Sequence, residues 1–131
     1  MTEIGERAFE GCTGLTSISV VSDNAKYDSR DNCSAIIETV TNILISGCKN
    51  TIIPNNVTEI GVAAFEGCTG LTSIVIPNSV TEIGGSAFCG CKGLTSIEIP
   101  NSVTEIGGIL AFYIRFHNSP EVLCQESVYK Y

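Results

Sequence analysis

The chain has 131 residues, of which 44% are hydrophobic and 16% are charged, so it can bury a core and fits one domain. Seven Lys and Arg against fourteen Asp and Glu give a net charge of −7. This balance argues against nucleic acid as a partner, because phosphates need a basic surface. No apolar run reaches the roughly 18 residues of a membrane-spanning helix, and the first residues do not resemble a signal peptide. We therefore expect a soluble folded unit without membrane insertion.

The chain opens with a unit that returns several times. Residues 2–20 read "TEIGERAFEGCTGLTSISV", and fuller forms occupy residues 55–77 and 78–100, which match at 17 of 23 positions. A further copy begins at residue 101 and departs after residue 108. A period of 23 lies within the range of leucine-rich repeats, about 20 to 29 residues. Such units must stack, because a single one cannot bury its own apolar face.

Residues 22–54 form an enlarged repeat. The distance from Val20 to its counterpart Ile53 is 33 residues, ten more than the regular period. Two β-prone segments, "SAIIE" and "NILIS", flank the polar "TVTN", which predicts a β-hairpin.

The regular unit predicts one short strand. In "SIVI", Ile74 and Ile76 would face the core, whereas Ser73 and Val75 would face the other way. Pro77 would end the strand, because proline cannot donate a ladder hydrogen bond.

The second half of the unit predicts a corner and a short helical segment. Val80 and Ile83 would turn inward, and Gly84 would allow a tight corner. "SAFCGC" (residues 86–91) suits one or two turns of α or 3-10 helix, with Ala87 and Phe88 packed under the sheet. The fold class expected is an α/β repeat solenoid with a parallel sheet along one side.

The C-terminal part is irregular. After residue 108 the repeat gives way to "ILAFYIRF", which is apolar. Solenoid ends need polar caps, so either the tail covers the last coil or a second copy does, which would be self-association through uncapped ends. We divide the single domain, residues 1–131, at about 1–21, 22–54, 55–77, 78–100 and 101–112 (partial), followed by an irregular tail, 113–131.

One cysteine column predicts buried thiols, although the spacing of adjacent coils is near that of a disulfide, and the total of seven cysteines limits disulfide pairing. Cys12, Cys68 and Cys91 share one repeat position and should form a column of small buried side chains. An odd count excludes complete intramolecular pairing. Cys89 and Cys91 could form one pair of metal ligands, but the sequence has no second Cys/His pair at the spacing of a zinc site.

A second column consists of Glu3, Glu59, Glu82 and Glu105. Stacked carboxylates repel each other and could attract a hard cation, but we interpret them as a solvated face. His117 is the only histidine, and nothing pairs it with a nucleophile. The sequence therefore predicts no catalytic residue, no cofactor and no metal site.

The outward strand positions are the candidate interaction face, because the extended sheet of a repeat protein commonly binds partners. This face is rich in hydroxyls and lacks Trp, Tyr and Arg anchors, so it suits weak, multivalent contact. The alternative is a polar face with no partner. The candidate residues are Ser17, Ser19, Ser73, Val75, Ser96 and Glu98.

The motif "VTEIGxxAFxGCxxLTSIxIPxS", present at residues 57–79 and 80–102, resembles the BspA-like leucine-rich repeat family of bacterial and protozoan surface proteins. The resemblance covers about residues 2–108. It implies a right-handed leucine-rich repeat horseshoe with a parallel concave sheet, short helical or 3-10 turns on the convex side and no chemistry. It also implies a cell-surface or secreted location and adhesion to host, matrix or microbial surface proteins.

We therefore predict a non-enzymatic protein-interaction or adhesion module. The alternative is a structural spacer or fragment of a longer surface array, with no partner of its own.

Overall fold

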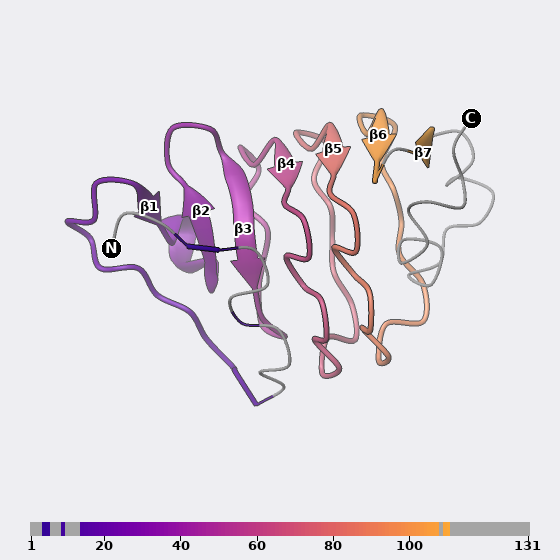
Figure 1. Cartoon of the computed structure of the whole chain (residues 1–131), viewed down its shortest axis with the longest axis horizontal. Coiled ribbons are helices and arrows are strands. Elements are labelled where there is room, and N and C mark those ends of the chain that lie inside the picture. The colour runs from indigo at the N-terminus through magenta and orange to yellow at the C-terminus, as the bar shows by residue number, and fades with distance from the viewer. Residues whose placement is uncertain (1–3, 6–8, 10–13, 108, 111–131) are drawn as a thin grey trace.

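A computed structural model describes residues 4, 5, 9 and 14–107 and the backbone of residues 109–110. Within these residues, all strands belong to one sheet in chain order (Figure 1). The inner neighbours β3, β4, β5 and β6 run parallel, whereas the pairs β1–β2, β2–β3 and β6–β7 are antiparallel. The elements are β1 (Tyr27–Asp28), the 3-10 helix η1 (Arg30–Asn32), β2 (Ala35–Glu38), β3 (Ile43–Gly47), β4 (Glu59–Ile60), β5 (Glu82–Ile83), β6 (Glu105–Ile106) and β7 (Ile109–Leu110).

The enlarged repeat contains the predicted β-hairpin, and this prediction is confirmed. Strands β2 and β3 pair from Ala35 with Gly47 to Glu38 with Ile43, with the turn between them. The short strand β1 adds a third strand to the hairpin.

A side-chain network fixes the base of this hairpin. The Arg30 guanidinium donates to both carboxylate oxygens of Asp28, at 2.7 and 2.8 Å, and to Oδ1 of Asn42 at 2.7 Å. The Thr39 hydroxyl also donates to Asp28, at 2.6 Å. Two parallel charge-assisted bonds of this kind hold a definite geometry, so the network ties η1 to the turn that follows β2.

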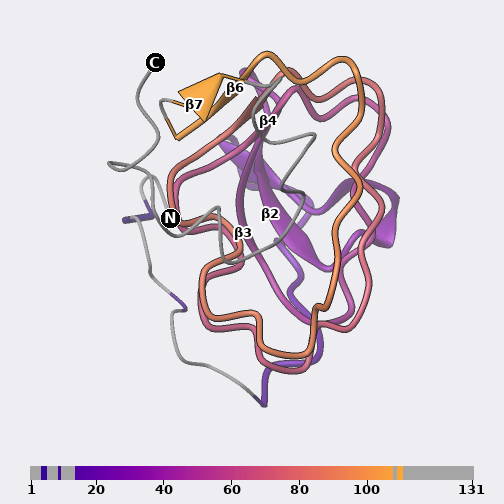
Figure 2. The ribbon, with the colours of Figure 1, turned by 90° about the vertical axis from the view of Figure 1, so that its right-hand side faces the viewer.

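The regular repeats form coils that stack along one axis, and seen end-on the coils that carry β4, β5 and β6 overlay one another (Figure 2). Backbone hydrogen bonds join neighbouring coils at the glycine of "TEIG": Gly84 N–H donates to Ile60 O at 2.7 Å, and Gly107 N–H donates to Ile83 O at 3.0 Å. A second set joins the "AF-GC" turns, where Phe65 N–H donates to Ala87 O at 2.8 Å.

The predicted position of the parallel strands was wrong. We expected them at "SIVI", but among the described residues the parallel ladder runs through the Glu-Ile pair of "TEIG", and no strand lies at residues 72–76 or 95–99. The glycine that follows the Glu-Ile pair explains its position. A Cβ on Gly84 would lie 2.5 Å from the backbone nitrogen of Val62, so only glycine lets the coils approach this closely.

The predicted helical segment was also wrong. Residues 85–90 form consecutive turns in place of a helix, and Ser86 and Gly90 have φ angles of 60° and 78°. In the equivalent turn of the preceding coil, Ala64 N–H bonds back to Gly61 O, whereas Phe65 N–H bonds to the next coil. This alternation removes every other donor from the local turn, so a continuous helix cannot form.

The core follows the predicted side-chain pattern. Val80, Ile83, Ala87 and Phe88 are all at most 1% exposed. Phe88 stacks on its counterpart Phe65, with ring centroids 5.2 Å apart and planes 5° from parallel. The predicted core register of the repeat is therefore confirmed.

The predictions for the two ends can be followed only in part. Strand β7 pairs with β6 and so covers the edge of the parallel ladder. The tail, residues 113–131, and His117 within it lie outside the described residues. No helix in the part of the chain that the structure describes is long and apolar enough to span a bilayer.

Candidate functional site

The predicted interaction face consists of exposed side chains. Ser17, Ser19, Ser73, Val75, Ser96 and Glu98 all lie at the surface. The alternation within "SIVI" places them there: Ile76 is 6% exposed, and its neighbour Val75 is 81% exposed. The sequence therefore predicted which side chains point outward, although no strand is present at this position.

Three of these residues line one groove, which we call the cross-coil groove. It has a volume of about 1030 Å³ and crosses three consecutive coils, through residues 51–53 and 55, 73–79 and 98–101. Ser73, Val75 and Glu98 belong to this lining, whereas Ser17, Ser19 and Ser96 do not. The structure thus brings half of the predicted face into one concavity.

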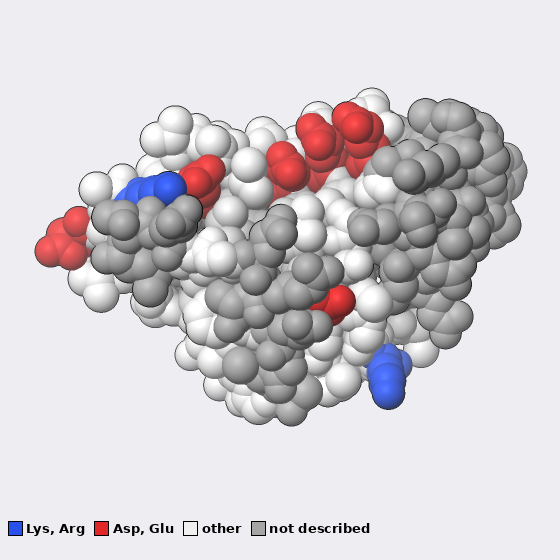
Figure 3. Space-filling view, in the orientation of Figure 1, with Lys and Arg blue, Asp and Glu red and all other residues white. Residues whose placement is uncertain are grey.

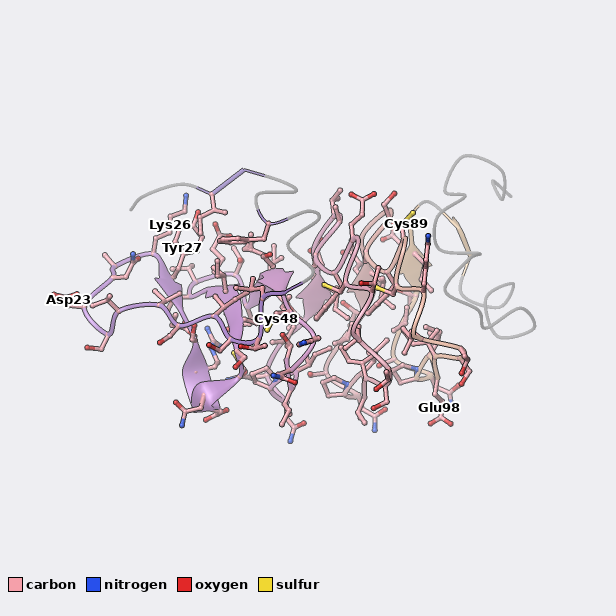
Figure 4. The ribbon with its side chains drawn as sticks, turned by 90° about the horizontal axis from the view of Figure 1, so that it is seen from below. Asp23, Lys26, Tyr27, Cys48, Cys89 and Glu98 are labelled. Carbon is pink, nitrogen blue, oxygen red and sulfur yellow. The ribbon has the colours of Figure 1, made fainter. Side chains whose placement is uncertain are left out.

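The centre of the cross-coil groove is a column of repeat-equivalent positions, 52, 75 and 98. Ile52 is 77% exposed and Val75 is 81% exposed, and both are among the large hydrophobic side chains that the core does not cover. The third position is Glu98, whose side chain projects away from the ribbon (Figure 4). An aliphatic pair followed by a carboxylate therefore lies across the three coils.

The backbone that forms this groove is not used to join the coils. Among the residues that the structure describes, no backbone hydrogen bond connects residues 72–76 with residues 95–99. The stacking of these two segments therefore rests on their side chains and not on a backbone ladder between them.

An asparagine column borders the same groove. Asn55, Asn78 and Asn101 follow the repeat prolines, are exposed and belong to the lining. Each proline carbonyl accepts a hydrogen bond from the valine three residues later, as Val80 N–H does to Pro77 O at 3.1 Å, which holds the asparagine in a turn. We missed Ile52 and these asparagines in the sequence, although their 23-residue spacing would have identified them.

The glutamate column lies on another part of the coil. Glu59 pairs in register with Glu82, and Glu82 with Glu105, and their side chains form a row on the surface (Figure 3). Glu3 lies outside the described residues. Burial raises the pKa of Glu59, and repulsion by Glu82 and Glu105 adds to this effect.

The cysteine column is confirmed in part. Cys91 is a buried thiol, 4% exposed, that donates to Phe65 O at 3.1 Å, and Cys68 holds the equivalent position in the preceding coil. Burial raises the pKa of Cys91 to about 12, so this thiol stays protonated at neutral pH. Cys68 is half-buried, Cys12 lies outside the described residues, and Cys89 is disulfide-bonded.

A metal site was not predicted. Within the described ranges, no group of three or more His, Cys, Asp or Glu side chains is placed to hold a metal ion.

Stacked coils of 23 residues, joined backbone to backbone, define a repeat protein. The sequence matches the family model for the BspA type leucine-rich repeat region in six copies, over residues 1–41 and 43–121, and the chain belongs to this family. The match extends to residue 121, past residue 108, to which we traced the resemblance, and past residue 112, where we ended the last partial repeat. Members of the family are generally non-enzymatic, their repeats suggest protein interaction, and they are typically found at the cell surface or secreted. No curated protein and no solved structure matches the chain.

Proposed function

We propose that the chain is a single leucine-rich repeat domain that acts as a non-enzymatic adhesion module and binds host, matrix or microbial surface proteins from a cell-surface or secreted location. We further propose that its coils continue the right-handed solenoid horseshoe that the family resemblance implies. The observation that carries the function is the exposed aliphatic pair Ile52 and Val75 inside a groove that crosses three coils.

The energetics favour burial of this pair by a partner. Apolar surface removed from water contributes about 25 cal/mol per Å², and an exposed apolar patch in a concavity is typical of an interaction site. Hydroxyl and amide groups of Ser73, Asn55 and Asn78 surround the pair and can hydrogen-bond to a protein surface. The groove therefore combines an apolar centre with a polar border, as binding interfaces do.

The same groove favours weak individual contacts. None of the lining residues that the structure describes is a Trp, Tyr or Arg, and these are the side chains that dominate the energy of tight interfaces. Several copies of such a groove on one surface would compensate for weak individual contacts, because multiple weak sites together bind with high avidity.

A structural spacer is the second candidate, and it is favoured because the described part of the groove lining contains no aromatic anchor. A spacer separates other modules and has no partner of its own. The two functions make different predictions, because only an adhesion module has binding to lose.

The experiment measures binding of the purified chain to immobilised matrix proteins and to whole host cells. A variant with Lys at Ser73, Val75, Ser96 and Glu98 is compared with a control that carries Lys at exposed residues outside the groove. The control positions are Val21, Ser22, Val40 and Glu82, which give the same change in charge.

Saturable binding by the natural chain and by the control, lost in the groove variant, is the expected result. An absence of binding by the natural chain would favour the spacer. Equal binding by both variants would place the interaction on another surface.

A further inference from the structure

We propose that the cross-coil groove binds an extended peptide segment that carries aliphatic side chains followed by a Lys or Arg. This inference rests on the proposed function and names the chemistry of the partner. The observation behind it is the order of side chains at positions 52, 75 and 98, where two exposed aliphatic residues precede a carboxylate.

The spacing of the coils suits an extended chain. Neighbouring coils joined by a parallel ladder lie about 4.8 Å apart, so Ile52, Val75 and Glu98 span about 10 Å along the stack. In an extended peptide, side chains on one face recur at about 6.6 Å. Three such side chains span about 13 Å, so two of them can cover Ile52 and Val75, and a long, flexible third one must reach back about 3 Å to meet Glu98.

The border of the groove offers hydrogen bonds to a peptide backbone. Asn55 and Asn78 are exposed at one edge, and each amide can both donate and accept. The Ser73 hydroxyl belongs to the same lining. These groups match the alternating N–H and C=O groups of an extended segment and do not depend on its side chains.

The charge of Glu98 determines which third side chain the peptide needs and in which direction the peptide lies along the groove. Among the described residues that line the groove, Glu98 is the only ionisable one, and it lies at the end furthest from Ile52 in the order of coils. A basic side chain there gains an opposite charge, whereas an acidic one is repelled. The net charge of −7 also steers basic segments toward the chain.

The experiment uses fluorescein-labelled peptides and the full chain, with binding followed by fluorescence anisotropy up to millimolar concentrations. The main probe is Thr-Val-Thr-Val-Thr-Lys-Thr, in which two Val and one Lys share one face of the extended chain. A second probe has Glu in place of Lys. A third, Val-Val-Thr-Thr-Lys-Thr-Thr, has the same composition as the main probe but does not place the three side chains on one face.

Variants of the chain test each part of the column formed by positions 52, 75 and 98. Glu98→Lys reverses the charge, and the double change Ile52→Ser with Val75→Ser removes the aliphatic pair. Glu82→Lys and Val40→Ser are matched controls, because both residues are exposed and lie outside the groove.

We expect the natural chain to bind the main probe at least three-fold more tightly than the Glu probe and the rearranged probe. Glu98→Lys should reverse the preference between the Lys and Glu probes, and the double Ser variant should weaken binding about ten-fold. The two controls should bind as the natural chain does. A main probe that does not bind, or binding that the groove variants leave unchanged, overturns the inference.

The result separates this inference from the proposed function. Binding to matrix proteins or cells that the four-Lys variant loses, without peptide binding, would overturn only the partner chemistry. If the natural chain binds neither matrix proteins or cells nor the peptide, both the proposed function and this inference are overturned. Sedimentation showing a dimer that Glu98→Lys dissociates would assign the groove to a second copy of the chain and also overturn the peptide.

Discussion

Replacement of Gly84 by alanine tests whether close approach of neighbouring coils at glycine holds the stack together. The added Cβ would lie 2.5 Å from the Val62 nitrogen, 2.7 Å from the Gly61 carbonyl carbon and 2.8 Å from the Val62 Cα. All three atoms belong to the backbone of the preceding coil, so no side chain can move aside. The two coils must separate, and the hydrogen bond from Gly84 N–H to Ile60 O, 2.7 Å long, must lengthen or break.

The expected cost follows from these two effects. Overpacking of a tight contact costs about 1 to 3 kcal/mol, and loss of a hydrogen bond costs about 1 kcal/mol. We therefore expect Gly84→Ala to lower the free energy of unfolding by about 2 to 4 kcal/mol. The φ angle of Gly84 lies outside the left-handed range, so backbone strain does not add to this cost.

Urea unfolding followed by circular dichroism measures the change, and Gly14→Ala is the matched control. Nothing lies within 4 Å of a Cβ built on Gly14, so this variant should keep the stability of the natural chain within about 0.5 kcal/mol. Equal midpoints for the two variants would refute the reasoning, because the coils would then tolerate a side chain at their closest contact.

Three further predictions concern the core and the charged groups. Phe88→Ala should cost about 3 to 5 kcal/mol in urea unfolding, because the ring is fully buried and stacked; a cost under about 1 kcal/mol would contradict the repeat register. Burial and the neighbouring carboxylates raise the pKa of Glu59 above its usual value, so ionisation of Glu59 lowers the free energy of unfolding as the pH rises through the raised pKa. Glu59→Gln should therefore be more stable than the natural chain in urea unfolding at pH 7 but not below about pH 4, and equal stability of the two chains at pH 7 would contradict this. The Arg30 guanidinium lowers the pKa of Asp28 to about 2. The ionised Asp28 carboxylate therefore stabilises the fold above about pH 4, and this stabilisation is lost as the pH falls toward 2. Asp28→Asn should cost about 1 kcal/mol at pH 7, and a thermal denaturation series should show the two chains converging near pH 2.

The sequence predicted the features that depend on side-chain periodicity. The alternation of Ile74, Val75 and Ile76 assigned one face to the core and the other to solvent. The position of the parallel ladder could not be predicted in this way, because alternation indicates where side chains point and not whether the backbone bonds to a neighbour. That bonding depends on the close approach of Gly84 to Gly61 and Val62 of the preceding coil. We interpreted Gly84 only as a corner, because a contact with residues so far back in the chain is not visible in the local sequence.

The prediction of a helical segment was wrong for a related reason. The composition of residues 86–91 suits a short helix, but Ser86 adopts a φ of 60° because the hydrogen bonds run between coils. Helix propensity is a property of the local sequence, so it cannot take into account a backbone N–H group that bonds to another repeat. Part of the candidate site was missed because Ile52 stands next to Ile53 in the enlarged repeat, where the apolar pair resembles core.

The hydrogen bonds at the repeat glycines have a consequence for how such a gene can change in length. Ile83 O accepts from Gly107 as Ile60 O accepts from Gly84, so each coil presents to its successor the same surface that it meets on its predecessor. Duplication or deletion of one 23-residue unit would thus leave every remaining junction chemically the same. Unequal recombination between these near-identical segments could lengthen or shorten the array in whole coils, and selection could then act on reach and valency without first repairing the fold.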